Sequence, residues 1–327
     1  MTVKYSQHKN KNEVLSMLSY DKLKDKPKVL LAFTSLTACE FEKLLVAFKQ
    51  VSQQESKEVE KERQRAPGGG RKPTMGDYAD QLLFILFYMK TYPLQEVMAF
   101  LFSMSQAQTN EWIHHLAYLL QKALDKLGQL PERDSANLTE VLKAYDYLEF
   151  VQDGTERQRE RPKDEQTQRE YYSGKKKKHT VKNNLVVHPE SRRVCYLSPT
   201  VPGKKHDKKL ADEAKMTFPL NTILEQDTGY QGYQPDGVII LQPKKKPRKK
   251  ELSLSDKFIN KVISSARIIV ENIISGVKRC HIVKDVFRNK KDGFDDLVME
   301  IACGLHNLRT ANRSPFVPIS LVDFYFR

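Results

Sequence analysis

Three acidic residues stand where they could share divalent metal ions. Asp153 follows the apolar run YLEFVQ, and Asp227 follows TILEQ, so each comes at the end of a predicted strand. Glu271 lies in the apolar helical segment ARIIVENIISGVK, where an unpaired charge is costly. Carboxylates offer only oxygen ligands, which Mg²⁺ prefers, and two such ions can activate a water or 3′-hydroxyl against a phosphodiester.

Each of these acids also has a purely structural explanation. Asp153 before a glycine, and Asp227 before Thr-Gly, are ordinary turn sequences. Glu271 could pair with Arg267 or Lys278 along the same helix. Taken one at a time, the acids leave both interpretations open, and the surrounding charge has to favour one.

Positive charge dominates the chain and gathers near the predicted site. The 327 residues include 55 Lys and Arg against 41 Asp and Glu, a net charge of +14. This excess favours a polyanionic partner, with nucleic acid ahead of an anionic membrane surface. We expect the basic block YYSGKKKKHTVK to bind DNA phosphates, with Tyr171 or Tyr172 stacking on an unpaired base, although a solvated turn remains the alternative. The phosphate-binding candidates in this block are Lys175, Lys176, Lys177, Lys178 and Lys182.

The cysteines and the hydropathy pattern exclude other classes of protein. The four cysteines are far apart and form no C-x-x-C pair, so neither a disulfide scaffold nor a zinc site is indicated. The first residues contain no apolar signal core, and no apolar stretch reaches the roughly 18 residues that would span a bilayer. We therefore expect a cytoplasmic protein without a membrane partner.

Helical periodicity marks the N-terminal part of the chain. The segment 51–73 is polar, charged and glycine-rich, and is interpreted as an exposed loop. Residues 93–125 follow the pattern of a helix-turn-helix, with PLQEVMAFLF, a break at SMS and a long amphipathic helix. Its expected apolar contacts are Leu94, Val97, Ile113 and Leu116.

The second helix of this unit would enter the DNA major groove by its first turn. Its first residues are polar and can hydrogen-bond base edges or phosphates. They are Gln106, Gln108, Thr109 and Asn110. A helical hairpin without DNA-reading function gives the same pattern and remains the alternative.

A change from helical to strand-like patterns divides the chain. The segment GQLPERDSANL breaks the helices, so we place a helical DNA-binding domain at residues 1–137 and a catalytic domain at residues 138–327. Three consecutive strands, a helix, two strands and a long helix then follow. This order predicts an α/β core with a mixed sheet, preceded by an all-α domain.

Five stretches carry a resemblance to a known family. In chain order they are DGTERQRERP, QREYYSGKKKKHTVKNNLVV, GKKHDKKLAD, LEQDTGYQG and ARIIVENIISGVKRCHIV. Together they resemble the DDE transposases of bacterial insertion sequences, in the group related to the Harbinger transposases. The resemblance implies an RNase H-like catalytic core behind a helix-turn-helix, with Asp153, Asp227 and Glu271 as the catalytic acids and two Mg²⁺ ions, or Mn²⁺, as cofactors.

The last helix also resembles the family signature around the third acid. Arg267 precedes Glu271 by four residues and Lys278 follows it by seven, which implies that both bind DNA. The signature tyrosine is replaced by Ser264, a departure that affects how the helix handles transposon-end DNA and not the metal-binding acid.

The resemblance implies an activity and its partners. We expect the protein to bind terminal inverted repeats of a mobile element, to cleave double-stranded DNA there, and to transfer the ends into target DNA. Handling two ends implies a homodimer or higher oligomer, acting at the nucleoid in a bacterial cytoplasm. Two alternatives remain: a catalytically silent DNA-binding regulator derived from a transposase, and a nuclease that nicks without joining.

Overall fold

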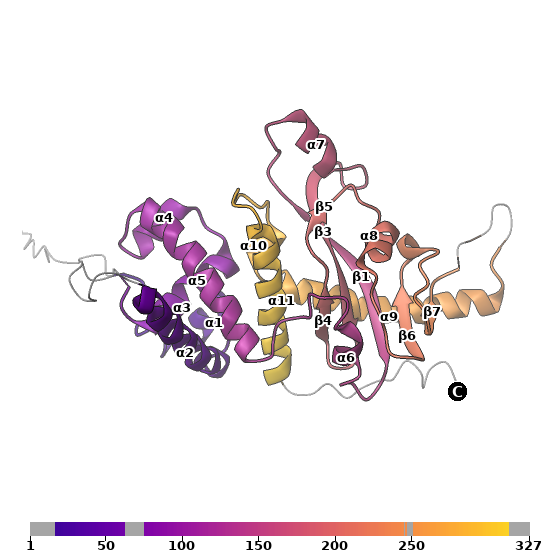
Figure 1. Cartoon of the computed structure of the whole chain (residues 1–327), viewed down its shortest axis with the longest axis horizontal. Helices are drawn as coiled ribbons and strands as arrows, with labels where there is room; N and C mark the ends of the chain where they lie inside the picture. The colour runs from indigo at the N-terminus through magenta and orange to yellow at the C-terminus, as the bar shows by residue number, and fades with distance from the viewer. Residues whose placement is uncertain (1–16, 63–74, 245, 247–250, 314–327) are drawn as a thin grey trace, which may run out of the picture.

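A computed structural model describes residues 17–62, 75–244, 246 and 251–313 of the chain. Helices fill the N-terminal part and lie to one side of a mixed sheet (Figure 1). No helix among the described residues is long and apolar enough to cross a membrane. The N-terminal helices are α1 (Pro27–Thr34), α2 (Ala38–Glu62), α3 (Tyr78–Thr91), α4 (Gln95–Leu101) and α5 (Gln106–Lys126), followed by the short α6 (Leu138–Leu142).

Helix α3 is the centre of the helical part, because every residue from Leu82 to Met89 is buried. The loop predicted at residues 51–73 is wrong for residues 51–62, which continue α2. This segment is rich in Gln, Glu and Lys, which favour helix, and residues 51–66 contain no glycine or proline. The Ser52 and Ser56 hydroxyls also donate to the carbonyls four residues earlier. Residues 63–74 lie outside the described part of the chain.

Helices α4 and α5 form the predicted helix-turn-helix. Ser105 begins α5 with a reciprocal capping box, in which its side chain accepts from the Gln108 amide. Ile113 is buried, as predicted, but Leu94 and Val97 are 56% and 44% exposed. Leu94 and Val97 are thus apolar positions of the pattern that lie at the surface, because the short helix α4 turns only Met98 and Ala99 inward.

The sheet combines antiparallel and parallel strands, which confirms the predicted mixed α/β class. Antiparallel pairing joins β1 to β3 and β3 to β4, whereas β6 runs parallel to β1, and β7 parallel to β6. The principal strands are β1 (Glu149–Gln158), β3 (Lys178–His188), β4 (Arg193–Leu197), β6 (Thr222–Gln226) and β7 (Val238–Leu241). Two short strands, β2 (Tyr172–Ser173) and β5 (Val201–Pro202), also pair with β3.

Alternate residues of the strands face two different hydrophobic clusters. Phe150 and Val186 pack with residues of α6 and α8 (Asp207–Ala214) on one face of the sheet. Val151 and Leu185 pack on the other face, in a cluster that contains residues of α9 (Leu254–Val277), α10 (His281–Lys284) and α11 (Phe294–Asn312). The sheet is therefore covered on both faces, as a buried mixed sheet requires.

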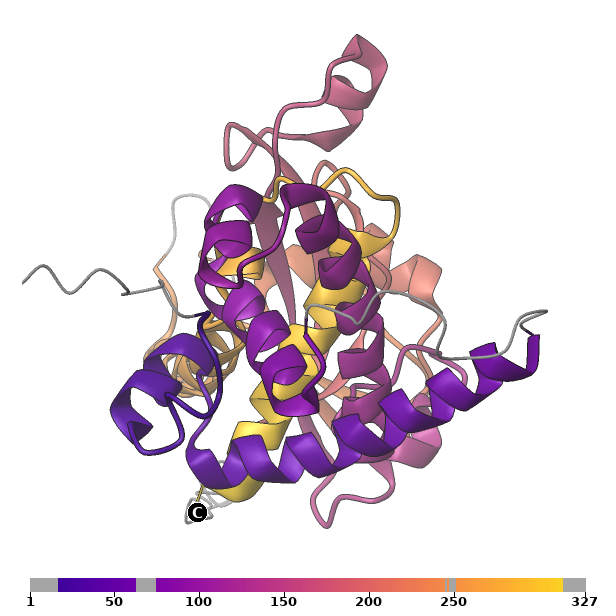
Figure 2. The same cartoon turned by 90° about the vertical axis from the view of Figure 1, so that its left-hand side faces the viewer.

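Helix α11 joins the two parts of the molecule. It lies between the N-terminal helices and the sheet, and it contacts both α5 and β4 (Figure 1). Its residues from Val298 to Arg309 are all buried. By contrast, α7 (Glu165–Tyr171) has no buried residue and projects from the body in both views (Figures 1 and 2).

Candidate active site

The sheet places the two predicted aspartates side by side. Parallel pairing of β1 with β6 matches Val151 to Glu225 and Gln152 to Gln226. Asp153 and Asp227 are the residues that directly follow this last matched pair, one on each strand. Two acids separated by 74 positions in the sequence are thus brought to the same end of the β1–β6 pairing.

Asp227 ends its strand as predicted, but Asp153 does not. Strand β1 continues past Asp153 to Gln158, because β3 pairs with it over that whole length. Asp153 therefore lies within a strand, and Gly154 continues the strand opposite Asn184 instead of forming a turn. Beyond Gln226, however, β6 no longer accompanies β1, so the edge of β1 opens beside Asp153.

Glu271 reaches the same opening from α9. It is exposed, although its neighbours Val270 and Ile273 are buried. The expected burial of Glu271 on an apolar face is therefore wrong. Two helical turns connect it to Lys278, and both side chains line one cleft with Asp153.

We call this depression the acid cleft. It has a volume of about 600 Å³ and contains more cations than acids. Its acids are Asp153, Glu156, Asp207 and Glu271, and its cations are Lys90, Lys175, Lys176, Lys182, Lys278, Arg279 and Lys284. Asp227 stands beside these residues, with its Oδ1 close to Asp207 above Gly229. An excess of ammonium groups around carboxylates suits a substrate that carries several phosphates.

Two ammonium groups of the cleft, those of Lys278 and Lys182, are partly withdrawn from water. Burial lowers the pKa of Lys278, and the nearby Lys176 and Arg157 lower it further, whereas Asp153 and Glu156 oppose the shift. Lys182 is only 8% exposed, and its Nζ lies 3.0 Å from Asp207 Oδ1. A desolvated ammonium binds an anion more strongly than one in open water.

Two of the four consecutive lysines reach the acid cleft. Lys175 and Lys176 line it from the turn between β2 and β3, while the Lys178 ammonium donates to Gln158 Oε1 at 3.1 Å. Lys177 is exposed in a left-handed conformation and is not among the residues that line the cleft. The basic block is thus divided between the cleft and the outer surface.

The two tyrosines of the block have ring partners within the protein. Arg159 lies over the Tyr171 ring at 4.3 Å, and Tyr172 meets His179 edge to face. Stacking of either tyrosine on a base would replace these contacts. Arg267 and Ser264 lie on α9, but their side chains are outside the described residues, as is most of the run from Lys244 to Lys250.

The predicted DNA-reading residues are partly occupied by contacts within the helix-turn-helix. Thr109 is fully buried, and its hydroxyl donates to the Ser105 carbonyl, so it cannot reach a base edge in this conformation. Gln108 serves the capping box, and Asn110 Oδ1 accepts from Gln95. Gln106 is exposed, although its amide also donates to Gln95. Gln106 is the best placed of the four to meet DNA.

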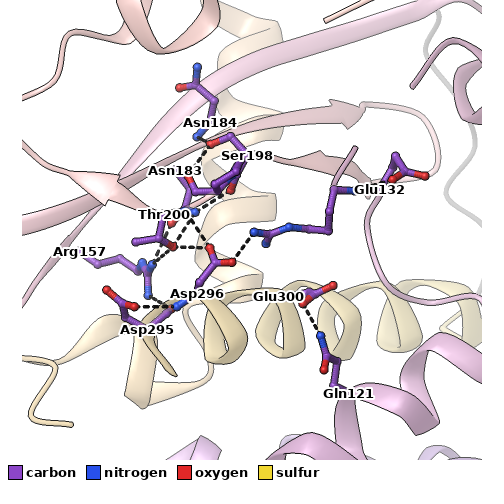
Figure 3. Close-up of polar contacts among 12 residues, drawn as sticks. Gln121, Glu132, Arg157, Asn183, Asn184, Ser198, Thr200, Asp295, Asp296 and Glu300 are labelled. Carbon is purple, nitrogen blue, oxygen red and sulfur yellow. Dashed lines mark hydrogen bonds and ion pairs between the residues drawn. The ribbon is translucent and has the colours of Figure 1, made fainter. Parts of the chain in front are cut away.

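A buried polar network supports β1 just beyond the acid cleft (Figure 3). Arg157, which is 3% exposed, donates from Nη1 to the Asp295 carbonyl and from Nη2 to Asn183 Oδ1 and Thr200 Oγ1. Burial lowers the pKa of its guanidinium to about 10, against the effect of Asp295 and Asp296. The network fixes β1 to the start of α11.

Asp296 connects this network to the helical part of the chain. Its Oδ1 accepts from the Thr200 amide and hydroxyl, and its Oδ2 pairs with Arg133 at 2.5 Å. Contacts with Arg133 and Thr200 lower the pKa of this carboxyl even though burial acts in the opposite direction. The strand that bears Asp153 is thereby held on the side of α11.

The donor chemistry of the acids fits a hard divalent ion. Carboxylate oxygens are the ligands that Mg²⁺ and Mn²⁺ take from proteins. Within the described part of the chain, however, no three acidic, histidine or cysteine side chains converge closely enough to enclose one ion. Asp227 Oδ1 and Asp207 Oδ2 both lie near Gly229, 2.7 and 3.1 Å from the position that a Cβ on this residue would take.

Asp207 was not selected from the sequence, although it belongs to the quoted stretch GKKHDKKLAD. An acid at the start of a predicted helix is common as a helix-stabilising residue, so its position alone gave no signal. The combination of an acid with a stretch shared with a transposase family was the available indication.

Comparisons with known proteins identify two matching families and a curated relative. The family described as "DDE superfamily endonuclease" matches residues 152–307, and "Helix-turn-helix of DDE superfamily endonuclease" matches residues 75–126. The chain is similar to a protein of Microchaete diplosiphon described as a probable transposase for insertion sequence element IS702. The two are 26% identical over 277 residues, covering 84% of this chain and 96% of the relative.

No solved structure matches the chain significantly. The two family matches nevertheless coincide with separate parts of the structure: the helix-turn-helix match covers α3 to α5, and the endonuclease match covers most of β1, the other principal strands and α8 to α10. Endonucleases of this superfamily generally use divalent metal ions, and the two matched regions together imply DNA binding. The chain belongs to the DDE transposases of insertion sequences.

Proposed function

We propose that the protein binds the terminal inverted repeats of its element, cleaves DNA at the element ends and transfers the ends into target DNA. The observation that carries this proposal is that Asp153 and Glu271 line one cation-rich cleft, with Asp227 at the end of the strand that pairs with β1 beside Asp153. The acids come from two parallel strands and a helix that covers the sheet, and a binding protein without catalysis has no need for that arrangement.

Each acid has a distinct role in this proposal. Asp153 and Asp227 would hold two Mg²⁺ ions, with Mn²⁺ as a substitute, and Glu271 would complete the second site. When bound, such ions supply activation of the attacking hydroxyl and stabilisation of the leaving oxygen. The exposure of Glu271 leaves its carboxylate accessible when DNA enters the acid cleft.

The cations of the cleft hold the DNA strand over the acids. Lys175, Lys176 and Lys278 line the opening and bind phosphates on either side of the cleaved bond. Arg267, four residues before Glu271 in the sequence, is a further candidate for phosphate binding, and Lys177 and Lys178, which do not line the cleft, contact the flanking duplex. Partial desolvation of Lys278 strengthens its attraction for a phosphate.

The remaining parts of the proposal concern recognition and assembly. The helix-turn-helix reads the inverted repeats, with Gln106 as its principal contact. Residues 1–137 form the DNA-binding domain and residues 138–327 the catalytic domain. Because two ends are cut and joined in one reaction, the protein acts as a dimer or higher oligomer on DNA, in the bacterial cytoplasm.

A paired-end assay with matched variants tests this function. DNA carrying the element's inverted repeats, a target plasmid and Mg²⁺ should give cleaved and joined products with the wild-type protein. Asp153→Asn should lower cleavage by on the order of 10³-fold, since it removes a charged ligand worth several kcal/mol, while end binding stays within about twofold. Asp212→Asn, on the exposed surface of α8, should change neither.

The same assay separates the alternatives. Nicking without joined products would indicate a nuclease, and binding without any cleavage by the wild-type protein would indicate a DNA-binding regulator. Cleavage retained by Asp153→Asn would contradict the assignment of that carboxylate.

A further inference from the structure

The carboxylate of Asp207 is wedged between two glycines that accompany the proposed catalytic aspartates. A Cβ placed on Gly154 would lie 2.8 Å from Asp207 Oδ1, and a Cβ on Gly229 would lie 3.1 Å from Asp207 Oδ2. Gly154 directly follows Asp153, and Gly229 is two residues after Asp227. One side chain thus touches both segments that bear the proposed metal ligands.

Close approach, and not backbone freedom, explains why glycine occupies these two positions. Neither Gly154 nor Gly229 has a positive φ, so an L-residue could adopt either backbone conformation without strain. A methyl group on Gly154 would lie only 2.8 Å from Asp207 Oδ1, so one of the two would have to shift. A methyl group on Gly229 would meet Asp227 Oδ1 first, at 2.7 Å, and would lie tightly against Asp207 Oδ2 at 3.1 Å. The Asp207 carboxylate thus occupies the space above Gly154 and shares the space above Gly229 with Asp227.

Asp207 also fixes a buried cation of the acid cleft. Its Oδ1 pairs with the Lys182 ammonium at 3.0 Å, and Lys182 also donates to the Lys205 carbonyl at 3.0 Å. Since Lys182 is 8% exposed, removing the carboxylate would leave a nearly buried ammonium without its counter-charge. This pair is unlike Asp212 with Lys208 on the same helix, where both side chains are more than 40% exposed.

We propose that Asp207 is a positioning residue of the active site. Its carboxylate sets the spacing between the segments of Asp153 and Asp227 and holds Lys182 at the base of the acid cleft. The proposal rests on the proposed function, because it assigns to those two aspartates the binding of divalent ions. A helix-stabilising acid at the start of α8 would not need contact with either glycine, which is what distinguishes the two roles.

Binding of Mn²⁺ to the full chain, measured by calorimetry without DNA, tests this assignment. Asp207→Asn should weaken Mn²⁺ binding by about 10- to 100-fold, the usual effect of losing a residue that orients metal ligands. Asp212→Asn should leave the affinity unchanged. Equal affinity of the wild-type protein and Asp207→Asn, including no measurable binding by either, would overturn the proposal.

A second comparison tests the contact between Asp207 and Gly154 directly. Made in the wild-type chain, Gly154→Ala should weaken Mn²⁺ binding about as much as Asp207→Asn does. Made in an Asp207→Ala chain, where the carboxylate is absent, Gly154→Ala should have little further effect. An equal effect of Gly154→Ala in both chains would also overturn the proposal. A wild-type protein that binds Mn²⁺ but cuts no DNA would contradict the proposed function and leave this comparison readable.

Discussion

Asp153 and Arg157 lie four residues apart on the same face of β1, but their surroundings differ. Arg157 is closed inside a network in which both terminal nitrogens donate to oxygens of neighbouring elements. Asp153 lines an open cleft among lysines. The hydrogen bonds of Arg157 tie β1 to neighbouring elements, whereas the Asp153 carboxylate lies at a cation-lined opening that a ligand can enter.

The same contrast applies within the helix-turn-helix. Polar residues at the start of α5 suggested a DNA-reading surface, but Thr109 and Gln108 serve the start of the helix itself. A polar side chain in the first helical turn has two competing uses, as a cap or as a contact, and the sequence does not separate them.

The largest effect on stability should come from removing the buried guanidinium of Arg157. Arg157→Met leaves Asn183, Thr200 and the Asp295 carbonyl without their buried donor, so the free energy of unfolding should fall by about 3–5 kcal/mol. Urea unfolding measures this change. Arg159→Met, which loses only its contact over the Tyr171 ring, is the matched control. Equal losses for the two variants would contradict the stabilising role assigned to the buried network of Arg157.

A second effect should appear as a pH dependence of stability. Burial, together with Arg309, lowers the pKa of His306 on α11 to about 4 from 6.5. As pH falls below 6.5 the unfolded chain takes up a proton that the folded chain refuses, so stability decreases until about pH 4. The slope from this one group should approach about 1.4 kcal/mol per pH unit.

The matched variant isolates the contribution of His306. His306→Gln can keep a donor to the Arg192 carbonyl but does not titrate, so its unfolding free energy should fall less steeply between pH 6.5 and 4. Thermal or urea unfolding across that range gives the slopes of both proteins. Identical slopes would show that His306 does not stay neutral in the folded chain.

The smallest expected effect concerns DNA reading. Gln106→Ala removes the exposed amide at the start of α5 and should weaken binding to inverted-repeat DNA by about 1–3 kcal/mol, with relaxed specificity at one base position. Thr109→Val, buried at the next turn, should leave DNA affinity nearly unchanged. Fluorescence anisotropy with specific and scrambled DNA at fixed salt measures both. A stronger effect from Thr109→Val would reverse the assignment.

Much of the fold was predictable from the sequence because its elements are locally consistent. The spans of β3, β6 and α9 follow from apolar runs bounded by turn residues. The position of Asp153 next to Asp227 was not predictable in the same way, since it depends on the parallel register between β1 and β6, which ends at Gln152 and Gln226. The alternation of apolar residues predicts which residues share a face of the sheet, but it does not predict which strands pair.

Other features of the structure could not be predicted from the sequence, for identifiable physical reasons. Helix α11 is buried nearly all round, so it shows no amphipathic stripe to mark it. Helix α2 continues through a polar segment that composition alone assigns to a loop. Asp207 acquires its place only when α8 folds over the sheet and brings its carboxylate above Gly154 and Gly229.

The central claim is that Asp153 holds a divalent ion during DNA cleavage, and a change of ligand type tests it most directly. A cysteine thiolate binds Mn²⁺ or Zn²⁺ better than Mg²⁺. Cleavage of inverted-repeat DNA by Asp153→Cys should therefore be lost in Mg²⁺ and recover at least tenfold in Mn²⁺, relative to Asp153→Ala. Equal, unrecovered loss by both variants in both metals would contradict the account.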